Sequence, residues 1–445
     1  MGGNSTRVEQ GEIGPAVTFA EALKTFGVIG CMSFGGPAGQ IAMMHKMLVE
    51  EKRWLDERTY LLALNFCTLL PGPEAMQLAT YSGWRILGVK GGLAAGLLFV
   101  LPGAIVIAAL SLLYALYGEV PAVSAAFLGI KAAVLAIVIE ALLRIARRSL
   151  KEHAEWLIAF GAFVAIYFFK VPFPLIVVAA GAIGYLRSNG KDTEEAISPA
   201  PVLDAVSWQQ TARTLTFWLA VWILPLLAVA AMFGTDHVLS KIAVFFSKLA
   251  VVTFGGAYAV LAYMAQDVVQ QYGWLQPGEM LDGLGLAETT PGPLILVTEF
   301  VGFIASYRHG GGDPVLYGFL GAFVTLWATF APCFLWIFTG APYVARIANM
   351  PRLAGALSAI TAAVVGVILN LSVWFALHVI FQVVPEIAFG PLRFAAPQLE
   401  SINWTAACLA LLAAVALFKL RFGMLTTLAL SAGLALAASQ FVSLS

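Results

Sequence analysis

The chain has 445 residues, of which 60% are hydrophobic and only 11% are charged, and its formal net charge is zero. Soluble proteins carry about a quarter charged residues, so this composition predicts a multi-pass membrane protein in a lipid bilayer. The zero net charge argues against a nucleic-acid partner. Residues 1–15 are polar and lack the pattern of a signal peptide, so we expect an N-terminal tail there.

The chain carries no sequence signal for metal, disulfide or nucleotide chemistry. Its cysteines, at positions 31, 67, 333 and 408, have no paired spacing and lie in apolar stretches, which is typical of small buried side chains. The sequence contains no nucleotide-binding loop, no HExxH motif and no Cys/His metal spacing. We therefore expect no cofactor, no metal and no ATP-driven pumping within this chain.

The hydrophobic segments fall into two sets, and we expect all of them to be helical because a span in lipid must satisfy its own backbone hydrogen bonds. The first set runs at 16–33, 37–48, 59–70, 73–87, 91–117, 121–143, 154–169 and 172–187. A polar linker at 188–212 and a lone segment at 213–233 follow. The second set runs at 236–253, 257–268, 280–290, 294–307, 315–343, 351–382, 403–418 and 421–442.

The two sets are an internal duplication. The stretch TLLPGPE at 68–74 recurs as ETTPGP at 288–293, and SFGG at 33–36 recurs as TFGG at 253–256, all at one offset of 220 residues. Beyond Pro314 the offset becomes 230, and the repeat covers most of both halves. The sequence therefore predicts a first repeat at 16–187 and a second at 236–442, with the lone segment at 213–233 as a linking transmembrane helix.

The lone segment and the charges predict that the second repeat is inverted. If each repeat makes an even number of crossings, one additional crossing places the second repeat upside down. Four basic residues lie between positions 45 and 59, and the equivalent stretch 265–279 has none. Under the positive-inside rule the first loop is cytoplasmic and the second is external.

Each repeat contains two apolar pairs that are interrupted by glycine and proline. Arms of 12–16 residues reach only about 18–24 Å, which is less than the roughly 30 Å of the hydrocarbon core. Re-entrant hairpins fit these lengths, and one long tilted span per pair is the alternative. The sequence thus predicts an all-α polytopic membrane protein with two inverted structural repeats and broken or re-entrant helices.

The breaks are candidate anion sites. A helix that begins at Pro37, Pro73 or Pro293 directs free N–H groups and the positive end of its dipole toward the break. The glycines before these prolines and their counterparts let backbone approach a ligand closely; they are Gly35, Gly36, Gly72, Gly255, Gly256 and Gly292. The alternative is that each break only kinks a span.

Lys131 is the most informative single residue because it lies eleventh in the apolar run 121–143. An unpaired charge at that depth costs at least about 2.5–3.5 kcal/mol. A central lysine beside helix N-termini would suit a dianionic substrate. The alternative is a structural ion pair with Glu74 or Glu140.

Polar residues around the breaks complete the predicted site. Glu74, in the first turn of its helix, is either a cap or a proton-coupling residue, and Glu288 and Glu299 are further proton-coupling candidates. Neutral groups that suit an oxygen-rich substrate are Ser33, Gln40, Gln77, Thr253, Thr289 and Thr290. Glu140 and Arg144 are one helical turn apart, and we expect them to pair at the cytoplasmic rim.

These motifs resemble the chromate ion transporter (CHR) family in its full-length two-domain form. The similar stretches are SFGGP at 33–37, LLPGPE at 69–74 with Gln77, GIK at 129–131, TFGGAY at 253–258 and AETTPGP at 287–293. The resemblance implies an inner-membrane protein that exports chromate from the cytoplasm and confers chromate resistance. It also implies glutamine where this chain has Glu299.

Chromate is nearly identical in size and charge to sulfate, and a hydrogen-bonding site discriminates well only when an analogue leaves buried groups unpaired. Sulfate is therefore the expected competitor, and the alternative function is transport of sulfate or another oxyanion with chromate as a mimic. Two other rivals are a membrane enzyme using Glu74 and Glu288 as an acid/base pair, which we disfavour, and a passive channel. The sequence leaves a homodimer open.

Overall fold

The computed structural model describes residues 17–34, 36–188, 207–254, 257–344, 350–390 and 392–440. The predicted N-terminal tail, most of the predicted linker and the glycines at 35, 255 and 256 lie outside these residues. Within them the chain is almost entirely helical, and one short antiparallel pair is formed by strands Glu386–Phe389 (β1) and Leu392–Ala395 (β2). The prediction of an all-α polytopic protein is confirmed, and the sequence did not predict this small hairpin.

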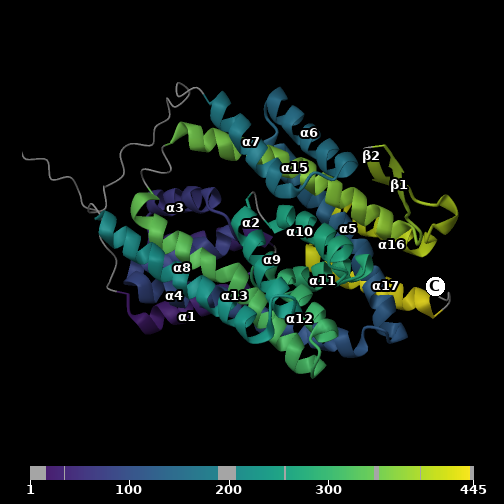
Figure 1. Ribbon diagram of the computed structural model, residues 1–445, viewed down its shortest axis with the longest axis horizontal. Coiled ribbons are helices and arrows are strands. Elements are labelled where there is room, and N and C mark those ends of the chain that lie inside the picture. Colours follow the sequence, from purple (N-terminus) through teal and green to yellow (C-terminus); the bar gives the residue numbers. More distant parts are fainter. Residues whose placement is uncertain are drawn as a thin grey trace, which may run out of the picture.

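The helices follow the predicted segments in order (Figure 1). The first set comprises α1 (Phe19–Met32), α2 (Gly36–His45), η1 (Lys46–Glu51), α3 (Glu57–Leu69), α4 (Glu74–Tyr117), α5 (Pro121–Ser149), α6 (His153–Phe169) and α7 (Phe173–Arg187). The linking helix is α8 (Trp208–Phe233). The second set comprises α9 (Val238–Val252), α10 (Ala257–Gln266), η2 (Asp267–Gln271), α11 (Pro277–Thr289), η3 (Leu294–Leu296), α12 (Val297–His309), α13 (Pro314–Gly340), η4 (Ala341–Tyr343), α15 (Pro351–Ile380), η5 (Leu399–Ser401), α16 (Trp404–Ala414), η6 (Val415–Lys419) and α17 (Met424–Ser439).

The linking helix begins five residues earlier than the predicted segment at 213–233. The hydroxyl of Ser207 accepts a hydrogen bond from the backbone N–H of Gln210, and the side-chain oxygen of Gln210 accepts one from the backbone N–H of Ser207. This capping box satisfies the first orphan N–H groups of the helix, so its polar first turn is helical although it is not apolar. The predicted domain boundaries themselves stay a prediction.

Helix α4 consists of two antiparallel arms. Leu87 and Gly88 have non-helical backbone angles, and Gly88 has a φ of 64° that an L side chain rarely adopts. The two arms then pack closely, because a Cβ at Gly83 would lie 2.3 Å from the carbonyl oxygen of Gly91. The chain therefore turns back at residues 87–88, and the separate segments at 73–87 and 91–117 are correctly predicted.

The broken helices form re-entrant hairpins rather than single tilted spans. The outer ends of α1 and η1 lie together, because Lys52 Nζ is 3.0 Å from a carboxylate oxygen of Glu21. The outer ends of α11 and α12 lie together in the same way, through a two-bond contact between Arg308 and Glu279. In each case the chain enters the protein, breaks at glycine, and returns to the side from which it came.

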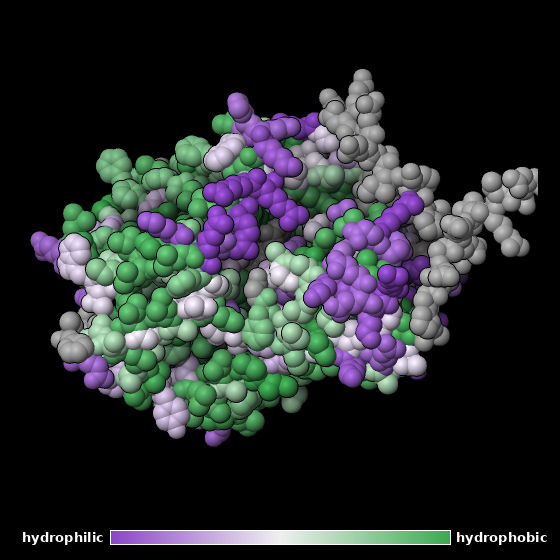
Figure 2. Space-filling model, turned by 180° about the vertical axis from the view of Figure 1, so that it is seen from behind, coloured by the Kyte–Doolittle hydropathy of each residue, from purple (hydrophilic) through white to green (hydrophobic). Residues whose placement is uncertain are grey.

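Five described helices are long and apolar enough to cross a membrane: α4, α5, α8, α13 with η4, and α15. Shorter apolar helices accompany them: α6, α7, α16 with η6, and α17. The face in Figure 2 is largely hydrophobic, and its hydrophilic residues gather in two clusters. This is the surface of a multi-pass membrane protein.

The path of the chain gathers basic residues at one end of the molecule. The first two hairpins open at this end, the second arm of α4 leaves it, and α5 returns to it. Exposed basic side chains lie there in the loop after η1 and in the last turns of α5, including Lys46, Lys52, Arg144 and Arg148. By the positive-inside rule we expect this end to be the cytoplasmic one.

The two halves exchange helices. In the second half α15 packs between α6 and α7 of the first half, as Figure 1 shows. Reciprocally, α5 of the first half packs against α16 and α17 of the second. Both contacts are too close for side chains larger than glycine, since a Cβ at Gly129 would lie 2.2 Å from the carbonyl oxygen of Ser431, and one at Gly366 would lie 2.0 Å from that of Ala159.

We predict that Gly83→Ala destabilises the protein by about 1–3 kcal/mol, because the new methyl group would overlap the opposite arm of α4. Gly161→Ala is the matched control, since it is also within a helix but has no atom within 4 Å of the added Cβ. It should leave stability unchanged or raise it by about 1 kcal/mol through helix propensity. Thermal unfolding in detergent measures both, and equal effects would contradict the close packing of the two arms.

Candidate functional site

Two hydrogen bonds join the helix breaks of one half to those of the other. The N–H of Gly72 donates to the carbonyl oxygen of Thr253 at 2.9 Å, and the N–H of Gly292 donates to that of Ser33 at 2.8 Å. The two bonds are related by the repeat, because Gly72 corresponds to Gly292 and Ser33 to Thr253. The predicted motifs at both positions therefore meet across an approximate two-fold axis.

The glycines at these contacts are required by the backbone. Gly72 has a φ of 122° and Gly292 has a φ of 93°, and both values are strained for any residue with a Cβ. A Cβ on Gly72 would also lie 2.7 Å from the side-chain nitrogen of Gln77 and 3.1 Å from the sulfur of Cys333. Glycine at these positions therefore lets one backbone approach another.

The hydroxyl groups predicted to face a substrate are already occupied as donors. Those of Ser33, Thr253, Thr289 and Thr290 each donate to a carbonyl three or four residues earlier in the chain, at 2.5–3.0 Å. A hydroxyl has a single proton to donate, and an oxyanion accepts rather than donates hydrogen bonds. These side chains thus satisfy the ends of the helices at the breaks in this conformation.

The two glutamines hold the breaks in place. Gln40 Nε2 donates to the carbonyl oxygens of Gly292 at 2.7 Å and Ser33 at 3.3 Å, and so ties its own break to the one from the other half. Gln77 Nε2 donates to the carbonyl oxygen of Pro71 at 2.7 Å. Both side chains are buried and their Oε1 atoms have no hydrogen-bond partner, so each retains an acceptor that a proton donor could occupy.

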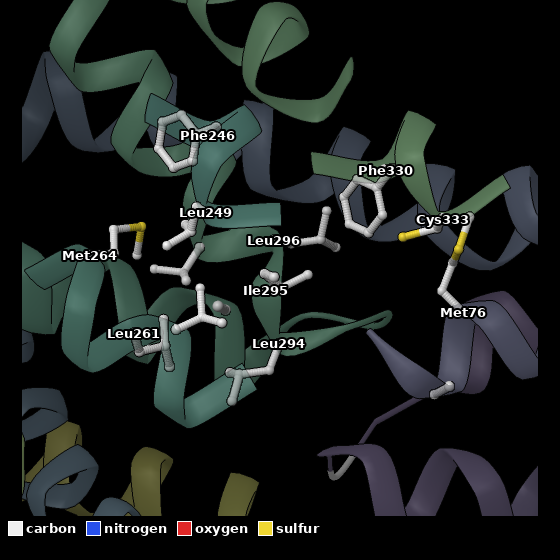
Figure 3. Packing of buried hydrophobic residues seen from close by; sticks show 14 of the residues in the cluster. Met76, Phe246, Leu249, Leu261, Met264, Leu294, Ile295, Leu296, Phe330 and Cys333 are labelled. Atoms are coloured by element: carbon white, nitrogen blue, oxygen red, sulfur yellow. The ribbon is translucent and has the colours of Figure 1, made fainter. Parts of the chain in front are cut away.

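The two Pro-Gly-Pro breaks differ in what covers the helix that follows them. Figure 3 shows Leu294, Ile295 and Leu296 among apolar side chains such as Leu249 and Phe330, and all of them are buried. The helix that starts at Glu74 is different, because Glu74 and the three residues before it are only partly buried. The break at residues 71–74 is therefore the more accessible of the two, although Ala75, Met76 and Gln77 directly after it are buried.

The predicted proton-coupling carboxylates have distinct environments. Glu288 accepts a hydrogen bond from the hydroxyl of Tyr258 at 2.7 Å. Glu299 is 1% exposed, and its Oε2 atom has no hydrogen-bond partner. An ionised carboxylate is costly in such a position, so the neutral form of Glu299 is the stable one unless a cation approaches.

Basic side chains from the cytoplasmic end of α5 lie within electrostatic range of these carboxylates. Arg148 attracts Glu74, and Arg144 attracts Glu288. Arg144 also forms the ion pair with Glu140 that the sequence predicted. Both arginines are exposed, so positive charge lies on the surface within electrostatic range of the breaks.

Lys131 does not form either of the ion pairs considered from the sequence. Its amine lies 3.2 Å from the carboxylate of Asp282 on α11 rather than beside Glu74 or Glu140. Asp282 is eight residues before Thr290, which corresponds to about 12 Å along a helix. Lys131 therefore lies away from the breaks, toward the external ends of the hairpin. Asp282 was overlooked, although a carboxylate inside the apolar run 280–290 is itself a signal.

Residues 20–185 and 240–437 match the family model described as chromate transporter. The chain belongs to the chromate transporter family. The stretch between the two matched parts contains the linker and the whole of α8. No solved structure matches the chain.

Curated relatives resemble the chain over most of its length. A chromate transport protein of Pseudomonas aeruginosa is 32% identical over 86% of this chain and 86% of the relative. A probable chromate transport protein of Synechococcus elongatus is 30% identical over 80% of this chain and 84% of the relative. An uncharacterized transporter of Methanocaldococcus jannaschii is 25% identical over 81% and 85%, respectively. These names describe transport proteins and favour a transporter over an enzyme.

We predict that Gly72→Ala lowers stability more than Gly234→Ala. Gly234, at the end of α8, also has a positive φ, of 87°, but has no atom within 4 Å of an added Cβ. Both substitutions cost about 1–3 kcal/mol of backbone strain, and only Gly72→Ala adds a clash with Gln77 and Cys333. Thermal unfolding of the two variants in detergent compares them directly. A Gly72→Ala variant as stable as Gly234→Ala would contradict the close contact at the break.

Proposed function

We propose that this protein is a secondary active transporter that exports chromate across the inner (plasma) membrane, is coupled to protons and confers chromate resistance. The observation that carries the proposal is the pair of hydrogen bonds between repeat-related breaks, Gly72 to Thr253 and Gly292 to Ser33. Inverted repeats whose broken helices meet inside the membrane are typical of carriers that alternate access around a central site.

The route that we propose follows α5. Anions would enter between Arg144 and Arg148 at the cytoplasmic end and reach the first turn of α4 beside Glu74. Lys131 lies 13 residues before Arg144 on the same helix, about 20 Å away along its axis. Positive charge is thus available at both ends of the route, and the N-terminal dipole of α4 is available between them.

Recognition in this proposal depends on backbone N–H groups and cations rather than on hydroxyl groups. Donors of this kind recognise the negative charge and the tetrahedral arrangement of oxygens in a dianion. Chromate and sulfate share both properties, so these donors do not distinguish them. Transport of sulfate or another oxyanion, with chromate as a mimic, is therefore the second candidate function. Sulfate is expected to compete in either case.

The coupling protons would bind to carboxylates beside the route. Glu74 is the candidate at the accessible break, and Glu288 and Glu299 are the candidates in the second half. Protonation of Glu74 would remove a negative charge next to the start of α4, where the substrate is also negative. Protonation and anion binding there would therefore assist one another.

The test is chromate flux in proteoliposomes with an imposed pH gradient, with and without excess sulfate. We expect flux that responds to the gradient and is inhibited by sulfate. Flux that ignores the gradient would instead favour a passive channel, and sulfate transport at a higher rate than chromate transport would favour the second candidate function.

We predict that Glu74→Gln weakens the dependence of flux on pH and increases chromate binding at neutral pH, because it removes the like charge at the start of α4. Glu400→Gln is the matched control, since Glu400 is exposed in η5 and its replacement should leave both quantities unchanged. Binding is measured by isothermal titration in detergent and flux in proteoliposomes. An unchanged pH dependence in Glu74→Gln would remove Glu74 from the coupling mechanism.

A further inference from the structure

Three polar side chains meet inside the membrane domain, away from the helix breaks. Lys131 of α5 lies 3.2 Å from Oδ2 of Asp282 on α11, and the hydroxyl of Tyr114 on α4 donates to the same oxygen at 2.8 Å. The side chain of Asp282 is 4% exposed, while that of Lys131 is 25% exposed. The lysine is therefore accessible to an ion that cannot reach the carboxylate.

The cluster is absent from the equivalent place in the other half. At the repeat offsets, Lys131 corresponds to Thr361, Asp282 to Leu62 and Tyr114 to Val344. The other half thus forms the same part of the fold with uncharged residues at all three positions. Burying an ion pair is weak evidence for stability, since apolar residues of similar volume often serve as well. Stability of the fold therefore does not explain why this half has an ion pair here.

The surroundings leave the pair incompletely satisfied. Oδ1 of Asp282 is buried and has no hydrogen-bond partner. The amine of Lys131 lies over Gly278, where a Cβ would be only 3.1 Å away, so it faces the first turn of α11, the positive end of that helix. A single carboxylate oxygen contacts an ammonium group that can donate three hydrogen bonds.

Other charges near the cluster come from its own hairpin and from one loop. They are Glu279 on α11, Arg308 on α12 and Glu119 after α4, and the first two bind each other. Two other described helices pack against α11. Helix α17 has no ionisable residue, and the ionisable residues of α15 are Arg352 and His378, near its two ends. Lys131 and Asp282 are thus each other's principal electrostatic partner.

We infer that Asp282 and the transported dianion compete for Lys131, and that Asp282 takes up a proton when the anion binds. This inference rests on the proposed transport function and adds a coupling residue to it. Without the anion, the ammonium and the carboxylate neutralise each other. When the dianion occupies Lys131, an ionised Asp282 would lie next to it as a buried like charge, so a proton from water neutralises the carboxylate.

The charges balance in a way that can be measured. The empty pair has no net charge, and the loaded site contains one ammonium, one neutral carboxyl and one dianion, with a net charge of minus one. By linkage, protons tighten anion binding to the same extent that the anion tightens proton binding. Anion and proton are therefore carried together through this site, and the dianion with this one proton has a net charge of minus one.

The experiment measures chromate binding to the purified full-length protein by isothermal titration across the neutral to alkaline range, where chromate remains a dianion. For each proton linked to binding, the affinity should fall about tenfold per pH unit as the pH rises. Asp282→Asn should reduce this dependence by one proton and bind chromate at high pH more tightly than the unmodified protein does at the same pH. Lys131→Ala should lose binding.

A second variant covers the case in which Asp282→Asn does not fold. Tyr114→Phe removes a donor that stabilises the ionised carboxylate, so Asp282 should accept its proton more readily and chromate should bind more tightly at a given pH. General damage to the structure would weaken binding instead. Tyr60→Phe is the matched control, because it removes another tyrosine hydroxyl donor, at 2.7 Å from the carbonyl oxygen of Ile41, and should leave binding unchanged.

The outcomes separate this inference from the proposed function. Absence of chromate binding and flux in the unmodified protein would overturn the proposed function. Binding and flux in the unmodified protein, together with an unchanged pH dependence in Asp282→Asn or unchanged affinity in Lys131→Ala, would overturn only the competition for Lys131. A Tyr114→Phe variant that binds more weakly than Tyr60→Phe would count against it in the same way.

Discussion

Backbone polar groups have no water to bind inside a bilayer, and the four helix breaks exist under this constraint. A broken helix leaves N–H and C=O groups unpaired, which in lipid costs several kcal/mol for each group. Here each half supplies what the other lacks, since Gly72 donates to Thr253 and Gly292 donates to Ser33. A break in each half thus gains a hydrogen-bond partner from the other half.

On this symmetric scaffold the chemistry is asymmetric. The glycines of the breaks recur in both halves, whereas Glu74 corresponds to Leu294 and Lys131 corresponds to Thr361. The second Pro-Gly-Pro is covered by apolar side chains and the first is partly open. Symmetry thus supplies two equivalent backbones, and the residues that differ between the halves supply the charges on which the proposed anion and proton sites depend.

The fold was largely predictable because its signals are local or recur at a fixed offset. Segment lengths and glycine–proline breaks indicated the hairpins. The site was less predictable because its contacts join distant parts of the chain. Lys131 was recognised as unusual, but its partner Asp282 is 151 residues away. The hydroxyls at the breaks look like ligands in sequence, yet their protons bind their own helices, a choice that only the backbone geometry reveals.

The exchange of α5 and α15 between the halves has a consequence for how such a protein can be assembled. Each half leaves a groove between its last two helices that only the long helix of the other half fills. A chain with one half alone would expose that groove and its small residues, and would be complete only when a second copy inserted with the opposite topology. Fusion of the two copies through α8 fixes the orientations permanently, and each half is then free to diverge without losing its partner.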